Sequence, residues 1–223
     1  MDAEEDQIGY DDPGSFTFNG PGPAESWHIQ ATMLDAYGGS SQVHRVVWDR
    51  VDSFTGSESY LLNLTAVDCM SFHYCRLFDR PSVLGILVHV GLTLVELTFD
   101  EGSTTHQAIT SLLAGLPHLR TLQVADLDVS DDNPMPGNLP EIPFFQGGHS
   151  FNFNINLKEP ASLSWIPASP RFRELEVETR CLFDEPRSVD RWIASSAASL
   201  ETLTIIGDPE GSCFSVSFSF DQP

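Results

Sequence analysis

The sequence predicts an α/β protein in which repeated segments stand side by side, forming a curved parallel sheet with helices or extended connectors on its convex side. Two observations predict this arrangement. A short pattern, apolar-x-x-apolar-x-apolar, returns at intervals of about 26 residues through most of the chain. Amphipathic segments of helical spacing precede several of its copies. One helix–strand unit cannot bury its own apolar face, so stacked units are expected to share one continuous core.

The apolar pattern places a series of predicted strands along the chain. Its copies are Val43/Val46/Trp48, Cys69/Phe72/Tyr74 (with Leu61/Leu64/Ala66 as a competing match), Leu94/Leu97/Phe99, Leu119/Leu122/Val124, Phe172/Leu175/Val177 and Leu200/Leu203/Ile205. The longest interval is filled by the alternating segment 151–157, in which Phe153 and Ile155 are assigned to the matching positions. In this register the pattern positions, Cys69 included, face the core, and the residues between them face outward.

The chain divides into three parts by composition. Residues 1–24 are predicted to be an acidic disordered tail, because acids, glycines and prolines are frequent there and apolar residues are few. Residues 25–206 hold the repeats and open with a segment of helical spacing that ends at Gly38-Gly39. Residues 207–223 are predicted to be a C-terminal tail with an edge strand. Apolar residues alternate there with serine, and the strand would cover the open edge of the sheet.

Helices are predicted before two of the strands, and extended connectors elsewhere. Residues 105–116 place leucines and an isoleucine on one stripe, and residues 188–199 do the same around Trp192. Ser103 or Thr104 is the expected cap of the first helix. Prolines and glycines interrupt the helical spacing in 130–148 and 158–171. There, aromatic side chains are expected to fill the convex side in place of helices: Trp165, Phe144 and Phe145.

The segments 91–99, Gly-Leu-Thr-Leu-Val-Glu-Leu-Thr-Phe, and 115–122, Gly-Leu-Pro-His-Leu-Arg-Thr-Leu, carry a family resemblance. They are similar to leucine-rich repeats with a helix on the convex side, and the chain resembles fungal F-box/leucine-rich-repeat proteins over residues 25–206. The resemblance implies a leucine-rich-repeat solenoid that recruits substrates for a cullin–RING ubiquitin ligase. An F-box is a longer helical segment, and residues 1–42 do not show its pattern. Residues 139–142 mimic its opening, but prolines and glycines follow. The ligase adaptor is therefore an expected partner only if an F-box is supplied elsewhere.

Composition limits the classes of partner. The chain has 11 Lys+Arg against 32 Asp+Glu, a formal net charge of −21 at pH 7. Nucleic acids and anionic membranes are therefore excluded as expected partners, because both require a basic surface. A signal peptide and a membrane-spanning run are not apparent, and the four cysteines are too sparse for a disulfide scaffold, so a cytoplasmic or nuclear location is expected. The expected partner is a protein with a basic patch.

The outward positions of the predicted strands form two columns. One column contains Glu96, Thr121, Asn152, Glu174 and Thr202, and the other contains Thr98, Gln123, Asn154, Glu176 and Thr204, with Asp100 and Glu178 at the edge. Solenoids commonly bind proteins on this surface, so we expect a non-enzymatic, acidic protein-binding face. A solvated acidic face that binds no partner is the alternative. The predicted binding residues are Glu96, Asp100, Gln123, Asn154, Glu174, Glu176 and Glu178.

Two other functions fit parts of the sequence less well. A metal-dependent hydrolase could use an acidic 126–132 loop that contains Asp126, Asp128, Asp131 and Asp132, but glycine and leucine stand where a calcium loop would place its glutamate. Cys69, His73 and Cys75 do not have the usual spacing of zinc ligands. No nucleophile motif or phosphate-binding loop occurs, so no cofactor, metal or catalytic residue is expected. An incomplete scaffold fragment is the remaining alternative.

Overall fold

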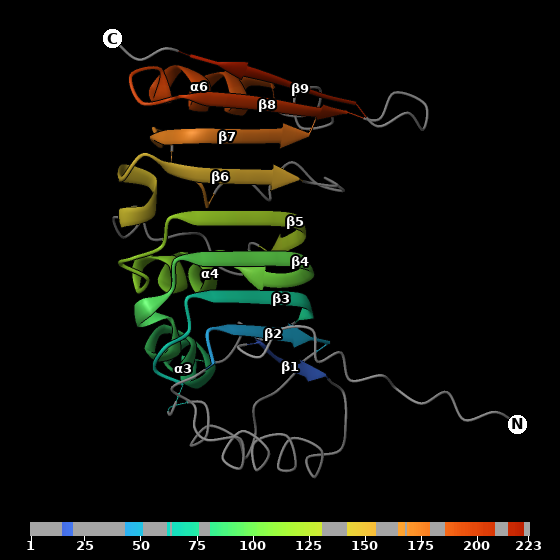
Figure 1. Ribbon diagram of the computed structural model, residues 1–223, viewed down its shortest axis with the longest axis vertical. Helices are drawn as coiled ribbons and strands as arrows, with labels where there is room; N and C mark the ends of the chain where they lie inside the picture. The colour runs from blue at the N-terminus through green and yellow to red at the C-terminus, as the bar shows by residue number, and fades with distance from the viewer. Residues whose placement is uncertain are drawn as a thin grey trace, which may run out of the picture.

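The computed structural model describes residues 15–19, 43–50, 62, 64–75, 81–130, 142–154, 165–167, 169–178, 186–207 and 214–220. They form an α/β structure with one nine-stranded sheet, in which the strands follow one another in sequence order, β1 to β9 (Figure 1). All neighbouring strands from β1 to β8 are parallel, as predicted, and β9 pairs with β8 in the antiparallel direction.

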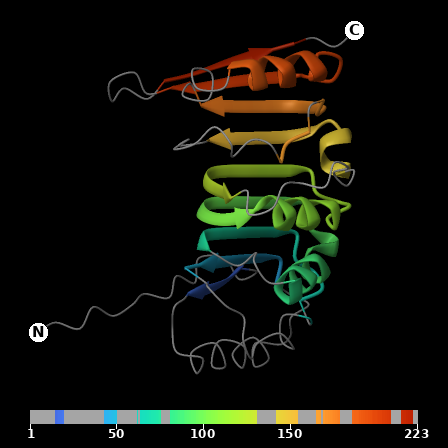
Figure 2. The ribbon, with the colours of Figure 1, turned by 180° about the vertical axis from the view of Figure 1, so that it is seen from behind.

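Successive strands from β1 to β8 run in the same direction, and described parts of the connections between them contain helices and 3₁₀ turns. The strands are β1 (Ser15–Asn19), β2 (Arg45–Asp49), β3 (Cys69–Cys75), β4 (Glu96–Thr105), β5 (Thr121–Ser130), β6 (His149–Asn154), β7 (Phe172–Glu178), β8 (Thr202–Gly207) and β9 (Phe214–Ser219). The helices are α3 (Pro81–Val90), α4 (His106–Ala114) and α6 (Pro186–Ser196), with short 3₁₀ turns η2 (Gly91–Thr93) and η3 (Pro143–Gln146). Helices α4 and α6 lie behind the sheet in Figure 1 and in front of it in Figure 2, which identifies the helix side; the opposite surface is called the open face.

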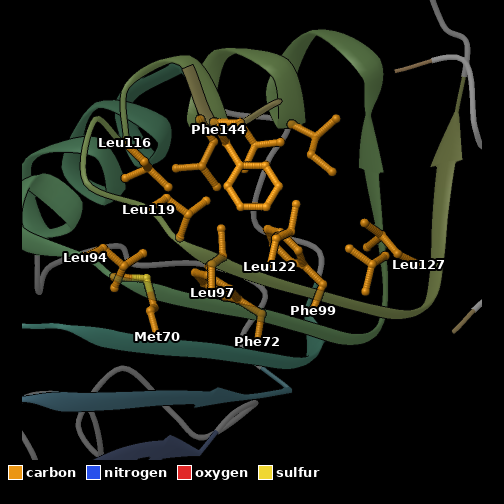
Figure 3. Close-up of a cluster of buried hydrophobic side chains, with 14 of the residues drawn as sticks. Met70, Phe72, Leu94, Leu97, Phe99, Leu116, Leu119, Leu122, Leu127 and Phe144 are labelled. Atoms are coloured by element: carbon orange, nitrogen blue, oxygen red, sulfur yellow. The ribbon is translucent and has the colours of Figure 1, made fainter. Parts of the chain in front are cut away.

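The core consists of two rows of side chains that run across the sheet on its helix side. One row aligns Val46, Met70, Leu97, Leu122, Phe151, Leu175 and Leu203, and the next aligns Trp48, Phe72, Phe99, Val124, Phe153, Val177 and Ile205. From β2 to β7 the described side chains of both rows are buried. Leucines of α4 and the loop leucines Leu94 and Leu119 pack over them (Figure 3). The predicted alignment of Leu97, Leu122, Leu175 and Leu203 is therefore confirmed.

Two predicted strand registers are wrong by two residues. The pattern positions belong to Val67, before β3, and to Met70 and Phe72 within it, all of them buried. Tyr74 is 48% exposed, and Cys69, although buried, belongs to a column of the open face. In β6 the row positions belong to Phe151 and Phe153 instead of Phe153 and Ile155. Side chains alternate with a period of two, so a two-residue shift leaves the alternation of a strand unchanged. Only the pairing with neighbouring strands distinguishes the two registers.

The tail predicted for residues 1–24 contains a strand. Ser15–Asn19 forms β1 and pairs in parallel with β2, with Phe16 opposite Val46 and Phe18 opposite Trp48. The prediction of disorder is wrong for these residues, because parallel pairing with β2 gives them a regular strand conformation. The rest of the tail and the helix expected at 25–39 lie outside the described residues.

The connections match the predictions in part. Helix α4 confirms the helix predicted at 105–116, and α6 confirms the one at 188–199. The cap of α4 is Thr105, not Ser103 or Thr104, and its hydroxyl accepts a 3.2 Å hydrogen bond from the Ala108 amide. The described part of the connection before β6, residues 142–148, contains the 3₁₀ turn η3, and Phe144, Phe145 and Trp165 are buried on the helix side as expected. Among the described residues, no helix combines the length and apolar character needed to cross a membrane.

Candidate protein-binding face

The open face presents three columns of residues that run across the strands. The first column aligns Arg45, Cys69, Glu96, Thr121, Ser150, Glu174 and Thr202. The second aligns Val47, Ser71, Thr98, Gln123, Asn152, Glu176 and Thr204. The third begins with Asp49, His73, Asp100 and Ala125. Neighbouring strands lie about 4.8 Å apart, so each column brings residues that are distant in sequence into side-chain contact range.

The structure places five of the seven predicted binding residues on this face. Glu96 and Glu174 are exposed members of the first column, Gln123 and Glu176 belong to the second, and Asp100 belongs to the third. The columns expected for β6 are corrected by the same two-residue shift: Ser150 stands where Asn152 was expected, and Asn152 stands where Asn154 was expected. The backbone of Asn154 is paired with Ala125 and that of Glu178 with Ile206. The side chains of these two residues lie outside the description.

Two acids of β7 are held by hydrogen bonds from the preceding strand, β6. The Ser150 hydroxyl donates to Glu174 Oε2 at 2.9 Å, and the Asn152 amide donates to Glu176 Oε1 at 2.5 Å. These bonds restrict the rotamers of both side chains. Because Glu174 is exposed and Glu176 is partly exposed, an incoming cation meets two oriented carboxylates on one strand. Sequence columns alone could not identify Ser150 as a partner, since the register assigned to β6 was wrong.

The β2–β4 part of the face carries both signs of charge. Cys69 lies between Arg45 and Glu96, and its burial raises the pKa of the thiol, which favours the neutral form. In the third column, His73 Nδ1 is 2.9 Å from Asp100 Oδ2. The pair joins β3 to β4 and leaves Asp100 less available to a partner than the sequence suggests.

A second set of contacts lies beside this pair, at the ends of the same strands. The Arg50 guanidinium carbon lies 5.6 Å from the centroid of the Tyr74 ring, within the range of a cation–π contact. The Tyr74 hydroxyl donates a 3.1 Å hydrogen bond to Glu101 Oε1. That hydrogen bond, together with the charge of Glu101, raises the pKa of Tyr74. The sequence does not indicate this set, because its members come from β3, β4 and the residue after β2, and follow no motif.

These contacts depend on an unusual backbone conformation. Arg50, Tyr74, Glu101 and Asp126 have φ between 49° and 55°, in the left-handed region that non-glycine residues rarely adopt. They stand at equivalent places, because the pairing passes from His73–Asp100 to Cys75–Gly102 and from Asp100–Ala125 to Gly102–Leu127. We call this row the left-handed corner. It turns each strand at the same level, and a Cβ at Gly102 would stand 2.8 Å from the Cys75 carbonyl oxygen.

The acidic segment proposed for metal binding does not begin as a loop. Asp126 and Asp128 belong to β5, which continues past the corner because Leu127 and Val129 are buried. Asp131 and Asp132 lie outside the described residues. Within the described part of the chain, no group of three or more histidine, cysteine or acidic side chains could hold a metal ion. The Cys75 thiol donates to the carbonyls of Trp48 and His73.

No protein-family model, curated protein or solved structure matches this chain. The side chains of the open face are therefore the basis for a functional assignment. Carboxylates and amides held across neighbouring strands bind cationic and hydrogen-bonding groups.

Proposed function

We propose that this chain is a leucine-rich-repeat solenoid whose open face binds a protein with a basic patch. The repeat assignment is supported by the sequential strand order and by the core row from Val46 to Leu203, whose neighbouring members are 24 to 29 residues apart. Each repeat supplies one strand and shares its core with the next. The same stacking aligns the outward residues into columns that a partner can contact together.

The observation that carries the binding proposal is the oriented pair Glu174 and Glu176. Hydrogen bonds from Ser150 and Asn152 hold both carboxylates on the open face. An arginine can form two parallel hydrogen bonds to a carboxylate, so a basic peptide or loop is the ligand that suits this pair. The net charge of −21 adds long-range attraction, which accelerates the encounter with a basic partner and weakens as salt is added.

Recruitment of substrates to a cullin–RING ubiquitin ligase is the finer proposal. It is supported by the resemblance of the repeats, and it requires an F-box supplied by another segment or another chain. A cytoplasmic or nuclear location belongs to the same proposal. In this role the open face would select the substrate, and the ligase adaptor would bind elsewhere.

Charge reversal tests the proposed binding face. The double variant Glu174→Arg/Glu176→Arg removes both carboxylates and should reduce the recovery of salt-sensitive partners from a source lysate about tenfold or more, since each buried or oriented charge pair contributes on the order of 1–3 kcal/mol. Partners are identified and quantified by mass spectrometry at two salt concentrations.

The matched control is Asp128→Arg/Asp190→Arg. It changes the net charge by the same amount at two exposed residues outside the oriented pair, on β5 and α6. The control should retain the partners that the first variant loses. Equal recovery with both variants, at equal salt sensitivity, would show that Glu174 and Glu176 do not form the binding site.

A further inference from the structure

Strand β9 forms one end of the sheet and exposes an apolar row. Its residues Val216, Phe218 and Phe220 are 44–46% exposed, although their neighbours across the pairing, Ile205 and Leu203, belong to the two core rows. The serines between them face the other side, where the Ser217 hydroxyl lies 2.9 Å from that of Thr204. In the described part of the chain, no strand pairs with the outer edge of β9.

The direction of the backbone groups at this edge follows from one hydrogen bond. The Phe220 amide donates to the Glu201 carbonyl at 2.8 Å, so Phe220 directs its polar backbone groups toward β8. In an antiparallel pair, the direction of the backbone N–H and C=O groups alternates from one residue to the next. The backbone groups of Phe218 and Val216 therefore also point toward β8. The N–H and C=O groups of Ser215, Ser217 and Ser219 therefore point to the outer edge, where they are available to a further strand.

We propose that a second copy of this chain occupies this edge, with the two β9 strands antiparallel and a two-fold axis through Ser217. Residues 214–220 read Phe-Ser-Val-Ser-Phe-Ser-Phe. Pairing about Ser217 places Phe214 opposite Phe220, Ser215 opposite Ser219 and Val216 opposite Phe218. All serines then lie on one face of the joined sheet and all apolar residues on the other, and the outward serines form the hydrogen-bonded pairs.

Charge explains why the occupant is a copy of the same chain. The net charge is −21, yet residues 214–220 carry no charged side chain, and charges are what usually protect an edge strand from pairing. A basic partner suited to the open face finds no acid on β9. Self-pairing, by contrast, needs only matched alternation, and it yields a closed two-fold interface because the same patch is used on both copies. This inference does not depend on the proposed binding function.

Sedimentation velocity of the full chain over a concentration series tests the proposal. We expect a monomer–dimer equilibrium that shifts toward dimer as salt screens the repulsion between two acidic chains, the opposite of the salt effect on a basic partner. Ser217→Pro removes an outward N–H without removing a β8 hydrogen bond, and should weaken the dimer about tenfold or more. Ser217→Ala loses the hydroxyl but keeps the N–H, and should dimerise as the unmodified chain does. Circular dichroism checks that both variants fold.

Cross-linking tests the position of the axis. Ser217→Cys brings two thiols together at the axis, where paired Cα atoms of an antiparallel ladder are about 5.5 Å apart, within the range of a disulfide. In Ser215→Cys the equivalent atoms are separated along the strand by roughly 14 Å, too far to join. Oxidation should therefore produce a covalent dimer of Ser217→Cys only, compared with Ser215→Cys and the unmodified chain. The proposal would be overturned by a chain that stays monomeric at all concentrations, or by another protein that pairs with β9 in place of the dimer. It would also be overturned by equal effects of Ser217→Pro and Ser217→Ala, or by cross-linking of Ser215→Cys.

Discussion

The region from β2 to β5 and the region from β6 to β8 use the same core rows but close their repeats differently. In the first region the strands turn at the left-handed corner, and α3 and α4 cover the helix side. In the second, η3 and a group of aromatic rings lie before β6, and α6 lies between β7 and β8. Phe145 contacts four rings there, with centroid distances of 5.3–6.1 Å: those of Phe144, Phe151, Trp165 and Phe172.

The comparison shows that the core rows tolerate different coverings. In β2 to β4 the second row is itself an aromatic stack, with centroids 6.2 Å apart for Trp48–Phe72 and 5.5 Å for Phe72–Phe99, and helices pack beside it. In β6 and β7 the rings of Phe151 and Phe172 stack at 4.9 Å, and further rings fill the space above. Buried apolar side chains cover the core rows in both regions, while the secondary structure that supplies them differs. The charged contacts differ too: His73 pairs with Asp100 in β3–β4, whereas in β6–β8 Ser150 and Asn152 hold two acids and Arg173 pairs with Glu201 at 2.7 Å.

The largest expected effect is on the aromatic covering. Phe145 is fully buried, so Phe145→Ala should lower the free energy of unfolding by about 3–5 kcal/mol, because it removes a ring and leaves a cavity. Leu113→Ala in α4, also fully buried, should cost about 2–5 kcal/mol. Chemical denaturation of both variants measures the two coverings on one scale. A loss below about 1 kcal/mol for Phe145→Ala would show that the aromatic covering is loosely packed.

The left-handed corner is the next feature to test. Glu101→Val places a β-branched residue at φ 50° and should cost about 1–2 kcal/mol more than Glu101→Asn, since asparagine tolerates this conformation. Both variants lose the hydrogen bond from Tyr74, so their difference isolates the backbone. Gln123→Val, at a regular exposed strand position, should change stability by less than about 0.5 kcal/mol. Equal stability of the two Glu101 variants in denaturation would mean that the corner is not strained.

The helical covering depends on its cap. Thr105→Ala removes the side-chain oxygen that accepts from Ala108 and should cost about 1 kcal/mol, while Thr105→Ser should retain most of the stability. Thermal unfolding compares the two. The 3₁₀ turn η3 has no such side-chain cap, so this dependence is expected in the β2–β5 region. If the melting temperature of Thr105→Ala were unchanged, packing alone would determine where α4 begins.

The smallest expected effect concerns pH. Burial, with a contribution from Arg120, lowers the pKa of His149 below its ordinary value of 6.5. The folded chain therefore binds this proton less readily than the unfolded chain, so stability should fall as pH decreases below about 6.5 and level off below the folded pKa. His149→Phe keeps a ring stacked on Phe144 but removes this dependence. Denaturation at several pH values measures the stability of both chains. The decrease in stability below about pH 6.5 that is due to His149 should be absent from the variant.

Sequence alone predicted the parallel sheet and most of its core. Leu97, Leu122, Leu175 and Leu203 share one row as expected, because each sits in a strong apolar pattern with a leucine or phenylalanine three residues earlier. The prediction failed where the pattern was weak. In β3 the pattern was read as Cys69/Phe72/Tyr74, but Val67, Met70 and Phe72 occupy its three positions. In β6, the second phenylalanine of Phe-Asn-Phe was matched to the first row, but the first one belongs there.

The candidate site was predicted less completely than the fold. Five of the seven named residues are on the open face, because alternation decides the face of a strand residue. The bonds that orient Glu174 and Glu176 were not predicted, because their donors depend on the register of β6. The left-handed corner and the Arg50–Tyr74–Glu101 contacts had no signal in the sequence, since none of these residues is a glycine or asparagine.

By itself the sequence determined the repeat length, the side of the sheet that is apolar and the excess of acid on the chain. The repeat length follows from the recurrence of the apolar pattern, the apolar side from the period of two along each strand, and the excess of acid from composition. Only the tertiary structure decided which residues face each other across strands, where the strands turn and what covers the core between α4 and α6. A two-residue shift preserves every local preference, so the choice among registers is made by hydrogen bonding and packing between neighbouring strands.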